Sequence, residues 1–409
     1  SKAASKAASK DEPPEDVPAE DVPAKEAPPS EMSSKDVRTA LRKALRALGD
    51  RRGEQPLVHA YVEPSVIAQI VSDWTGIPVG TMVQSELAQL LDLEDRLRER
   101  IVGQDHALAA ICRKIRAAKA GLEAPSQPIG AFLLVGPSGV GKTETALALA
   151  DALFGGERFI VTVNMSEFME KHTVSRLIGS PPGYVGYGEG GVLTEAVRHR
   201  PYSVVLLDEI EKAHPEVMNI FHQVFDKGML ADGEGRVVDF KNTVIVMTSN
   251  LGSEVIARVC NKHTPNETEL IELVRPELLK VFRPALLGRM TIVPYYPLSQ
   301  EIMRTIVRMK LARIDRRLRE RHGVALVVTE AAETVLLSRC TNPESGARDV
   351  DHVLDQAVLP RVSQSLLETM ADARTPTRVE LDVENAELVF RFELGAEPAP
   401  RGGKRKKKS

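Results

Sequence analysis

Short apolar segments alternate with longer helix-compatible segments through the middle of the chain. The apolar runs are at residues 131–135, 159–164, 204–207 and 243–247, and a helical pattern follows the first of them at 142–153. Continuously apolar strands separated by helices are typical of a parallel sheet that is covered on both faces. The pattern therefore predicts an α/β fold, with a three-layer αβα domain over residues 81–293.

The pattern changes after this region, so we expect a second, smaller α+β domain over residues 294–396. Longer helical segments are broken there by short strands. The expected helices are at 299–321, 330–340 and 347–369, and the expected strands are at 324–328, 378–382 and 388–393.

The N-terminal 36 residues repeat SKAASK and EDVPA units and are rich in proline, acids and alanine. Such a segment cannot bury enough apolar surface to offset the entropy of ordering it, so we expect a disordered tail over 1–36. Residues 37–80 are predicted to hold a helix and an ordered linker that ends in Trp74-Thr-Gly-Ile-Pro-Val79. Amphipathic helices are expected at 85–100 and 105–120, and a basic, solvated tail at 397–409.

Composition excludes several classes of function. The formal net charge of -3 and the 4% aromatic content argue against a chain-wide grip on nucleic acid. The three cysteines have no CxxC spacing, which favours reduced thiols and a cytoplasmic protein. No apolar run approaches the roughly 18 residues that a membrane helix needs.

A phosphate-binding motif lies between the first predicted strand and the helix that follows it. It matches GxxxxGK[ST] without a mismatch and consists of Gly136, Pro137, Ser138, Gly139, Val140, Gly141, Lys142 and Thr143. The glycines let backbone amides surround phosphate groups at a helix start. We expect Lys142 to reach the terminal phosphates and the Thr143 hydroxyl to bind Mg²⁺. ATP with Mg²⁺ is the predicted ligand.

Two carboxylates follow the predicted strand at 204–207. Asp208 at the strand end is placed to hold Mg²⁺, and Glu209 is placed to polarise an attacking water as a general base. Asn250 follows the next strand, and parallel strands bring their carboxyl ends together at a ligand. We expect Asn250 to orient the water and to sense the γ-phosphate.

Two arginines complete the predicted catalytic set. Arg289, near the end of the large domain, is a candidate arginine finger that crosses to a neighbour's nucleotide. Arg348 begins a helix of the smaller domain and is expected to reach the phosphates from there. Either residue alone would more often be a surface ion-pair partner, so both assignments depend on the nucleotide motifs.

Residues 179–191 hold six glycines around Tyr184 and Tyr187. The segment is too rich in glycine for a helix or strand interior and predicts a mobile loop. Tyr184 and Val185 at its tip could grip any side chain by steric contact. A second, polar loop at 232–236 is another candidate contact.

At these residues the chain resembles the Clp family of AAA+ unfoldases, and in particular their second ATPase ring. The resemblance runs from about residue 57 to 394 through GPSGVGKTE, GSPPGYVGYGEGG, LLDEIEKAHP and SGAR. It implies a homo-hexamer with nucleotide between subunits and Tyr184 lining a central pore. It also implies an adenine pocket near Ile101 and Val102.

Within the family the likeness is strongest to the ClpV branch, whose members recycle the contractile sheath of type VI secretion. FRPALLGRMTIVPYYPL carries much of it, and Gly288 stands where other Clp members have Asn before the finger. No apolar-Gly-apolar tripeptide occurs between Ser253 and Pro276, so no peptidase partner is expected. One phosphate loop where full-length members have two suggests a piece of a longer protein.

The sequence leaves three functional readings open. The first is an ATP-driven threading motor with sheath subunits as its client. The second is a disaggregating chaperone with the same chemistry and another client. The third is a nucleotide-switched assembly module, against which Lys142, Glu209, Arg289 and Arg348 all argue. A nucleic-acid motor is disfavoured by charge and by the aromatic loop, and no membrane insertion is expected.

Overall fold

The computed structural model describes residues 39, 66–67, 70–71 and 74, and then residues 86–184, 187–188, 190–263, 265–340, 346–371, 376–385 and 387–394. The chain divides into two units, Ser1–Val62 and Glu63–Ser409. The second unit contains the residues of both the large and the smaller domain expected from the sequence. The tails predicted at 1–36 and 397–409 lie outside the described residues, as does Val185.

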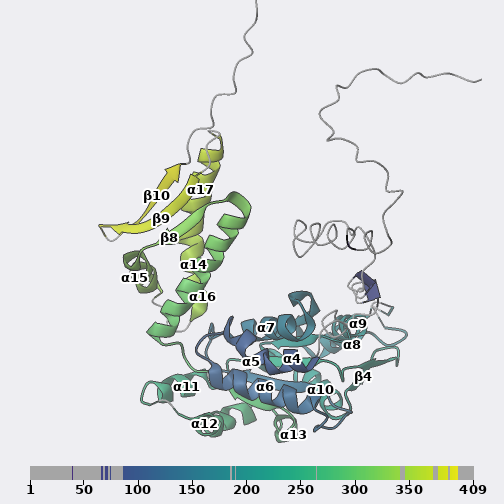
Figure 1. Ribbon diagram of the computed structural model, residues 1–409. Helices are drawn as coiled ribbons and strands as arrows, with labels where there is room; N and C mark the ends of the chain where they lie inside the picture. Colours follow the sequence, from purple (N-terminus) through teal and green to yellow (C-terminus); the bar gives the residue numbers. More distant parts are fainter. Residues whose placement is uncertain are drawn as a thin grey trace, which may run out of the picture. The chain divides into compact units, whose positions relative to one another are not determined.

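The large domain, whose helices are labelled in Figure 1, is built on a five-stranded parallel sheet with the strand order β2-β3-β6-β1-β7. Its strands are β1 (Gly130–Val135), β2 (Ile160–Asn164), β3 (Val204–Asp208), β6 (Val244–Ser249) and β7 (Thr291–Pro294). Every pairing in this sheet is parallel. The carboxyl ends of all five strands therefore lie at one edge, where a ligand is expected.

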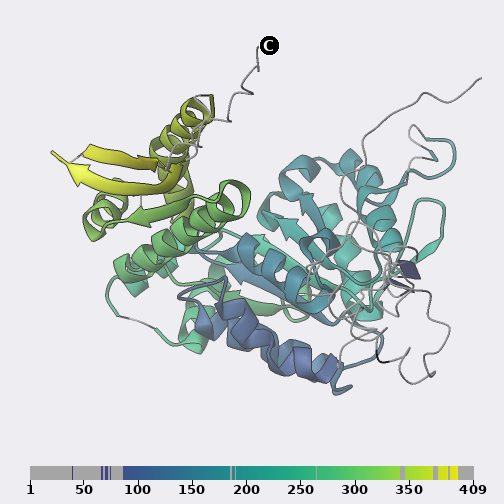
Figure 2. The same ribbon diagram turned by 45° about the horizontal axis from the view of Figure 1, so that its top comes forward.

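Alternate strand residues point to opposite faces, and the core divides accordingly. Phe132 and Leu134 of β1 belong to a cluster with helices α5 (Leu93–Arg98), α6 (Asp105–Lys119) and α7 (Lys142–Phe154). Leu133 and Val135 belong to a second cluster with α9 (Val192–His199), α10 (Pro215–Lys227), α11 (Ser253–Cys260) and α12 (Glu267–Leu279). The predicted three-layer arrangement is confirmed (Figure 2).

The structure differs from the expectation for this domain in three places. Residues 85–100 were expected as one helix, but α4 (Glu86–Leu91) and α5 are separate, with Asp92 between them. Edge strand β7 was not predicted, and it extends to Pro294, one residue past the expected boundary at 293. The polar loop at 232–236 connects two short paired strands, β4 (Met229–Ala231) and β5 (Val237–Asp239). This hairpin also was not predicted.

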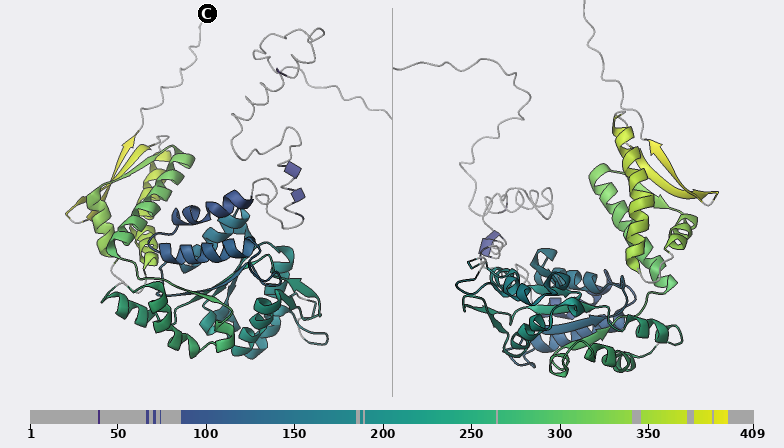
Figure 3. Two further views of the ribbon diagram at one scale, coloured as in Figure 1. Left: turned by 60° about the horizontal axis from the view of Figure 1, so that its bottom comes forward. Right: turned by 180° about the vertical axis from the view of Figure 1, so that it is seen from behind.

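The smaller domain has a three-stranded sheet of order β10-β9-β8 with helices beside it (Figure 3). Its elements are α14 (Gln300–His322), β8 (Ala325–Val328), α15 (Glu330–Arg339), α16 (Ala347–Val353), α17 (Leu359–Ala371), β9 (Pro376–Glu384) and β10 (Glu387–Leu394). The helix expected at 347–369 is present, but Leu354–Val358 form a π-helical turn between α16 and α17. A separate apolar core, which includes Leu311, Leu336 and Val379, confirms the α+β prediction.

Among the described residues, no helix combines the length and the apolar character that a membrane span requires.

Candidate nucleotide site

Three strand ends bring the predicted site residues together. In the β1–β6 pairing Leu134 lies opposite Thr248, and in the β3–β6 pairing Leu207 lies opposite Met247. The next residue of β3, Asp208, is therefore level with Thr248. The glycine-rich loop after β1, the acids after β3 and Asn250 after β6 all start from this edge.

The glycine-rich loop leaves β1 at Val135 and enters α7 at Lys142. A Cβ on Gly136 would lie 2.8 Å from the Tyr295 carbonyl oxygen, so a side chain has no room there. Gly141 caps α7 with φ 103°, which L side chains rarely adopt. The loop thus turns tightly onto a helix N-terminus, whose free amides and partial positive charge favour a phosphate.

The Lys142 ammonium is buried at the centre of this loop. Its Nζ donates to the carbonyl oxygens of Gly136 at 2.6 Å and Pro137 at 2.8 Å, and to Asn250 Oδ1 at 2.8 Å. Burial lowers the pKa of Lys142 to about 8, against the opposing effect of the nearby Glu211 carboxylate. A partly desolvated cation of this kind gains strongly from a phosphate partner.

Asp208, the last residue of β3, and Glu209, the residue after it, make different contacts. Asp208 accepts a hydrogen bond from the Thr248 hydroxyl. Glu209 has left-handed backbone angles, φ 55° and ψ 50°, and its N–H donates to Thr248 Oγ1 at 3.1 Å. Both carboxylates line the same cavity as Lys142.

Asn250 also lines the cavity, at the carboxyl end of β6. Its backbone N–H donates to Glu211 Oε1 at 3.1 Å, while its side chain accepts from Lys142. Glu211 Oε2 is buried and has no hydrogen-bond partner among the described residues. Glu211 therefore positions Asn250 and adds negative charge near Lys142, a contribution that the sequence analysis missed.

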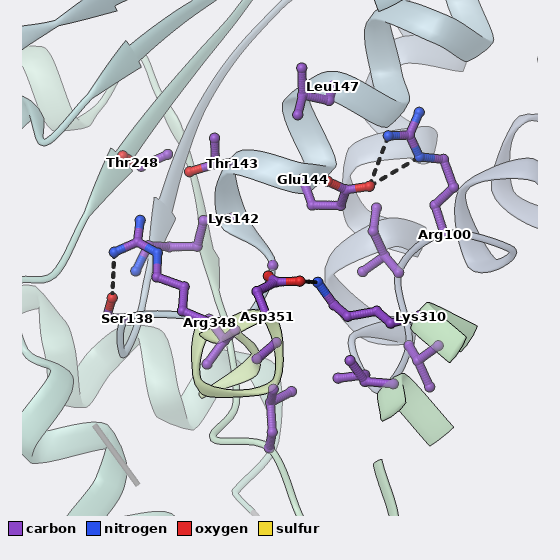
Figure 4. A pocket seen from close by; sticks show the side chains of 18 of the residues that line it. Arg100, Ser138, Lys142, Thr143, Glu144, Leu147, Thr248, Lys310, Arg348 and Asp351 are labelled. Atoms are coloured by element: carbon purple, nitrogen blue, oxygen red, sulfur yellow. Dashed lines mark hydrogen bonds and ion pairs between the residues drawn. The ribbon is translucent and has the colours of Figure 1, made fainter. Parts of the chain in front are cut away.

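The smaller domain reaches the glycine-rich loop through the start of α16. The Arg348 guanidinium donates to Ser138 Oγ at 3.0 Å, and the Ala347 N–H donates to the Gly139 carbonyl at 2.9 Å (Figure 4). These contacts place Arg348 on the same cavity as Lys142, and its predicted contact with the phosphates stays a prediction.

The cavity has a volume of about 290 Å³, and part of its lining is apolar. Ile101 and Val102 line it, together with Leu147, Leu298, Ile306 and Met309. An apolar slot beside a phosphate loop suits a nucleobase. Sequence reasoning missed the last four residues: Leu147, Ile306 and Met309 have the apolar spacing of ordinary helix core positions, and Leu298 lies outside a helix, just before α14.

Charged pairs also line the cavity. Arg100 donates to Glu144 Oε1 at 2.8 Å, and Lys310 pairs with Asp351 (Figure 4). Arg100 also donates to Glu157 Oε1 at 2.8 Å. Lys310 and Asp351 come from the smaller domain, whereas Glu144 belongs to α7, so both domains contribute charged residues to the lining.

The residues present fit magnesium. Thr143 and Asp208 offer one hydroxyl and one carboxylate on the same cavity, and Mg²⁺ prefers oxygen ligands. In nucleotide sites it usually takes one or two protein oxygens, with phosphate and water supplying the rest. No cluster of three or more His, Cys, Asp or Glu side chains suited to a metal occurs in the described part of the chain.

Arg289 is not among the described residues that line this cavity. It pairs with Asp226 of α10 and donates to the Ala285 carbonyl, and its guanidinium lowers the pKa of the Asp226 carboxyl. Its side chain remains about one-third exposed. The predicted role toward a neighbour's nucleotide stays a prediction.

Tyr184 also lies away from the cavity, at 71% exposure in the glycine-rich segment. A β-bridge between Gly179 and Gly190 closes that segment at its base. The Gly233 N–H of the second loop donates to the Ile178 carbonyl at 3.0 Å, and a Cβ on Gly233 would lie 2.4 Å from the Gly179 oxygen.

Charged contacts also stabilise the region where the tyrosine-containing segment 179–191 meets the polar loop 232–236. Arg198 of α9 pairs with Asp232 at the start of the second loop and with Glu195. Asp232 in turn accepts from the backbone N–H groups of Glu234 and Arg236 at 2.9 and 2.8 Å. The tyrosine loop (residues 179–191) and the polar loop (residues 232–236) are therefore held together where they attach to the domain.

Comparison with known proteins agrees with this geometry. The AAA domain family (Cdc48 subfamily) matches residues 127–293, and the C-terminal, D2-small domain of ClpB matches residues 298–379. The AAA+ ATPase ClpV1 of Pseudomonas aeruginosa is 51% identical over 343 residues, which are 83% of this chain and 38% of ClpV1.

Two further relatives have other names. The chaperone protein ClpB of Yersinia enterocolitica is 52% identical over 318 residues, 77% of this chain and 36% of that protein. ClpC/MecB of Bacillus subtilis, named a negative regulator of genetic competence, is 43% identical over 334 residues, 80% of this chain and 41% of that protein. The chain thus spans well under half the length of these relatives.

The first match covers the domain with the glycine-rich loop, and the second covers the smaller domain with the helix that carries Arg348. The chain belongs to the Clp family of AAA+ ATPases, and its domain pair is that of their second ATPase module.

Proposed function

We propose that this chain is an ATP-hydrolysing motor module that acts in a ring of six identical subunits and pulls on a polypeptide. The observation that carries the proposal is the single cavity lined by Lys142, Asp208, Glu209, Asn250 and Arg348. A cation, two acids, an amide and a second cation at one helix N-terminus provide the groups that phosphoryl transfer to water requires.

The roles follow from the positions of the side chains. The amides of the glycine-rich loop and Lys142 bind the β- and γ-phosphates. Thr143 and Asp208 hold Mg²⁺, which when bound offsets phosphate charge. Glu209 accepts a proton from the attacking water, and Asn250 orients that water. Arg348 contacts the phosphates from the smaller domain, so its position changes when the γ-phosphate is lost.

Arg289 supplies the remaining cation from a neighbouring subunit. Its position outside its own cavity and its partial exposure support a role toward another copy. A finger of this kind typically contributes on the order of a thousandfold or more to the rate. Release of the Asp226 pair would free the guanidinium for that contact.

The client is a polypeptide that the exposed Tyr184 grips, together with Val185, which follows it in the sequence. An aromatic side chain on a glycine-flanked loop contacts many side chains by van der Waals forces without requiring one sequence. We propose contracted type VI secretion sheath subunits as the client. The support is the ClpV-like sequence around Gly288 and Arg289 and the 51% identity to ClpV1.

A disaggregating chaperone is the second candidate, favoured by the 52% identity to ClpB. The two candidates differ in client, since their chemistry is the same. Binding of the assembled chain to unfolded polypeptides in general, with no preference for sheath subunits, would favour the chaperone. Neither candidate requires a peptidase, and we propose a cytoplasmic location for both.

Substitution of Glu209 by Gln tests the ATPase. The amide keeps the shape of the side chain but cannot accept the proton, so hydrolysis should fall by about a hundredfold or more while ATP binding stays within about twofold. Hydrolysis by phosphate release and binding by a fluorescent ATP analogue measure the two effects. Normal turnover in this variant would remove Glu209 from its role.

A further inference from the structure

The Thr248 hydroxyl lies between the two acids of the site. Thr248 is in β6 and only 3% exposed. Its Oγ1 bonds both to the Asp208 carboxylate and to the Glu209 N–H, the latter at 3.1 Å. Thr248 and Thr143 both line the cavity, and both are labelled in Figure 4.

The direction of each bond follows from the chemistry of the partners. A backbone N–H only donates, so Oγ1 is the acceptor toward Glu209. An ionised carboxylate only accepts, so the hydroxyl proton points to Asp208 Oδ1. One hydroxyl therefore serves both acids at once, and rotation away from either would break a bond.

For Glu209 this bond supports an unfavourable backbone conformation. Its φ of 55° and ψ of 50° are left-handed angles that a residue with a Cβ avoids. The Glu209 N–H is held by Thr248, and its carbonyl accepts from the Lys212 N–H at 2.9 Å. Loss of the hydroxyl leaves the N–H without its acceptor, and the backbone can then relax and turn the carboxylate away from the water.

For Asp208 the bond restrains the orientation of the carboxylate. Oδ1 accepts from the Thr248 hydroxyl, which limits rotation of the side chain that would hold Mg²⁺. A second partner that orients a metal-binding carboxylate commonly affects affinity or activity by 10- to 100-fold.

We propose that Thr248 is a positioning residue for ATP hydrolysis, because its hydroxyl sets the Asp208 carboxylate and the Glu209 backbone together. This inference rests on the metal and base roles proposed above for Asp208 and Glu209. Thr248 itself does not need to contact the reacting atoms.

The chain offers a matched control next to the start of the same strand. Thr243 directly precedes β6, is fully buried, and donates from Oγ1 to the Phe240 carbonyl at 2.7 Å. Thr243→Val therefore removes a buried hydroxyl of the same kind at the far end of the strand from the site. Comparable losses of melting temperature are expected for Thr243→Val and Thr248→Val.

The test compares Thr248→Val, Thr248→Ser and Thr243→Val in the full chain. Thr248→Val should lower kcat by about 10- to 100-fold, raise the Mg²⁺ concentration needed for half-maximal rate, and leave the ATP Kd within about twofold. Thr248→Ser restores the hydroxyl and should recover most of the rate. Thr243→Val should retain wild-type kcat and Mg²⁺ dependence.

The interpretation depends on the pattern across variants. If Thr248→Val matches Thr243→Val in kcat and Mg²⁺ dependence, or if Thr248→Ser is as slow as Thr248→Val, the positioning role is wrong. If Thr248→Val does not fold, Thr248→Ala is compared with Thr248→Ser in the same way. Normal hydrolysis by Glu209→Gln would instead overturn the proposed base, whatever Thr248 does.

A double variant isolates the part of the effect that acts through Glu209. In the Glu209→Gln background the base is absent, so Thr248→Val should reduce the residual rate less than it does in the wild type, by the part that acts through Asp208 alone. An equal fold-loss in both backgrounds would show that Thr248 does not act through Glu209.

Discussion

At the scale of single residues, the site is set by burial and by the acceptors around each charge. Lys142 is 8% exposed and lies between two carbonyls and an amide oxygen. None of these three acceptors carries a full charge, so they compensate burial only in part. The pKa of about 8 is the result, and it places the titration of Lys142 within reach of experiment.

ATP affinity should therefore depend on pH above neutrality. Phosphate raises the pKa of Lys142 in the complex, so binding above pH 8 requires uptake of a proton and becomes weaker. With a free pKa of about 8, the Kd at pH 9 should be about tenfold higher than at pH 7. Equilibrium titration with a fluorescent ATP analogue at constant ionic strength measures the change.

Lys142→Arg is the control for this titration. A guanidinium stays charged through this range, so its Kd should be nearly flat from pH 7 to 9, even if binding is weaker overall. A wild-type Kd that does not change over the same range would contradict a lowered pKa for Lys142.

At the scale of elements, the sequence predicted what depends on local pattern. The strands that lead to the site residues were predicted because they are short and continuously apolar. The glycine-rich loop was predicted because its residues match a motif of fixed spacing. Strand β7 was missed because its four residues become a strand only by pairing with β1. That pairing joins segments far apart in the sequence, and no local pattern reports it.

The site was predictable to a similar extent. Lys142, Asp208, Glu209, Asn250 and Arg348 were all named, and the structure brings them to one cavity. The apolar residues that line the cavity include Ile306 and Met309 of α14, which follow the same spacing as core residues. Only the placement of the smaller domain distinguishes them. Thr248 and Glu211 were missed for a related reason, since their roles lie in hydrogen bonds between strand ends.

The tyrosine loop leads to a prediction about coupling. Tyr184 is 71% exposed, and it lies outside the nucleotide cavity. Tyr184→Ala should leave ATP hydrolysis within about twofold and abolish unfolding of a fluorescent client protein, because the grip is lost and the chemistry is not. Tyr187→Ala is the matched variant, since Tyr187 is less exposed at 54%. A parallel fall of both activities in Tyr184→Ala would indicate a structural role.

At the scale of the whole molecule, the structure contains every part of the proposed site except the finger. Arg289 pairs with Asp226 on its own chain and is not among the described residues around the cavity. In the proposed function a complete site needs two copies, and identical copies related head to tail form a ring when the rotation between them closes. Sizing with a non-hydrolysable ATP analogue should show a shift to six copies.

Mixing two inactive variants tests this arrangement directly. Arg289→Ala keeps Glu209 but offers no finger, whereas Glu209→Gln offers a finger but has no base, so each alone should lose about a hundredfold or more of the rate. In a mixed ring, an Arg289→Ala subunit next to a Glu209→Gln subunit regains a complete site. Random mixing at equal amounts should make about a quarter of the sites complete, and ATPase activity should rise accordingly. A mixture of Glu209→Gln with Lys142→Ala has no complete site in any order and should stay inactive. If the first mixture also stays inactive while both variants assemble, Arg289 does not act across the subunit boundary.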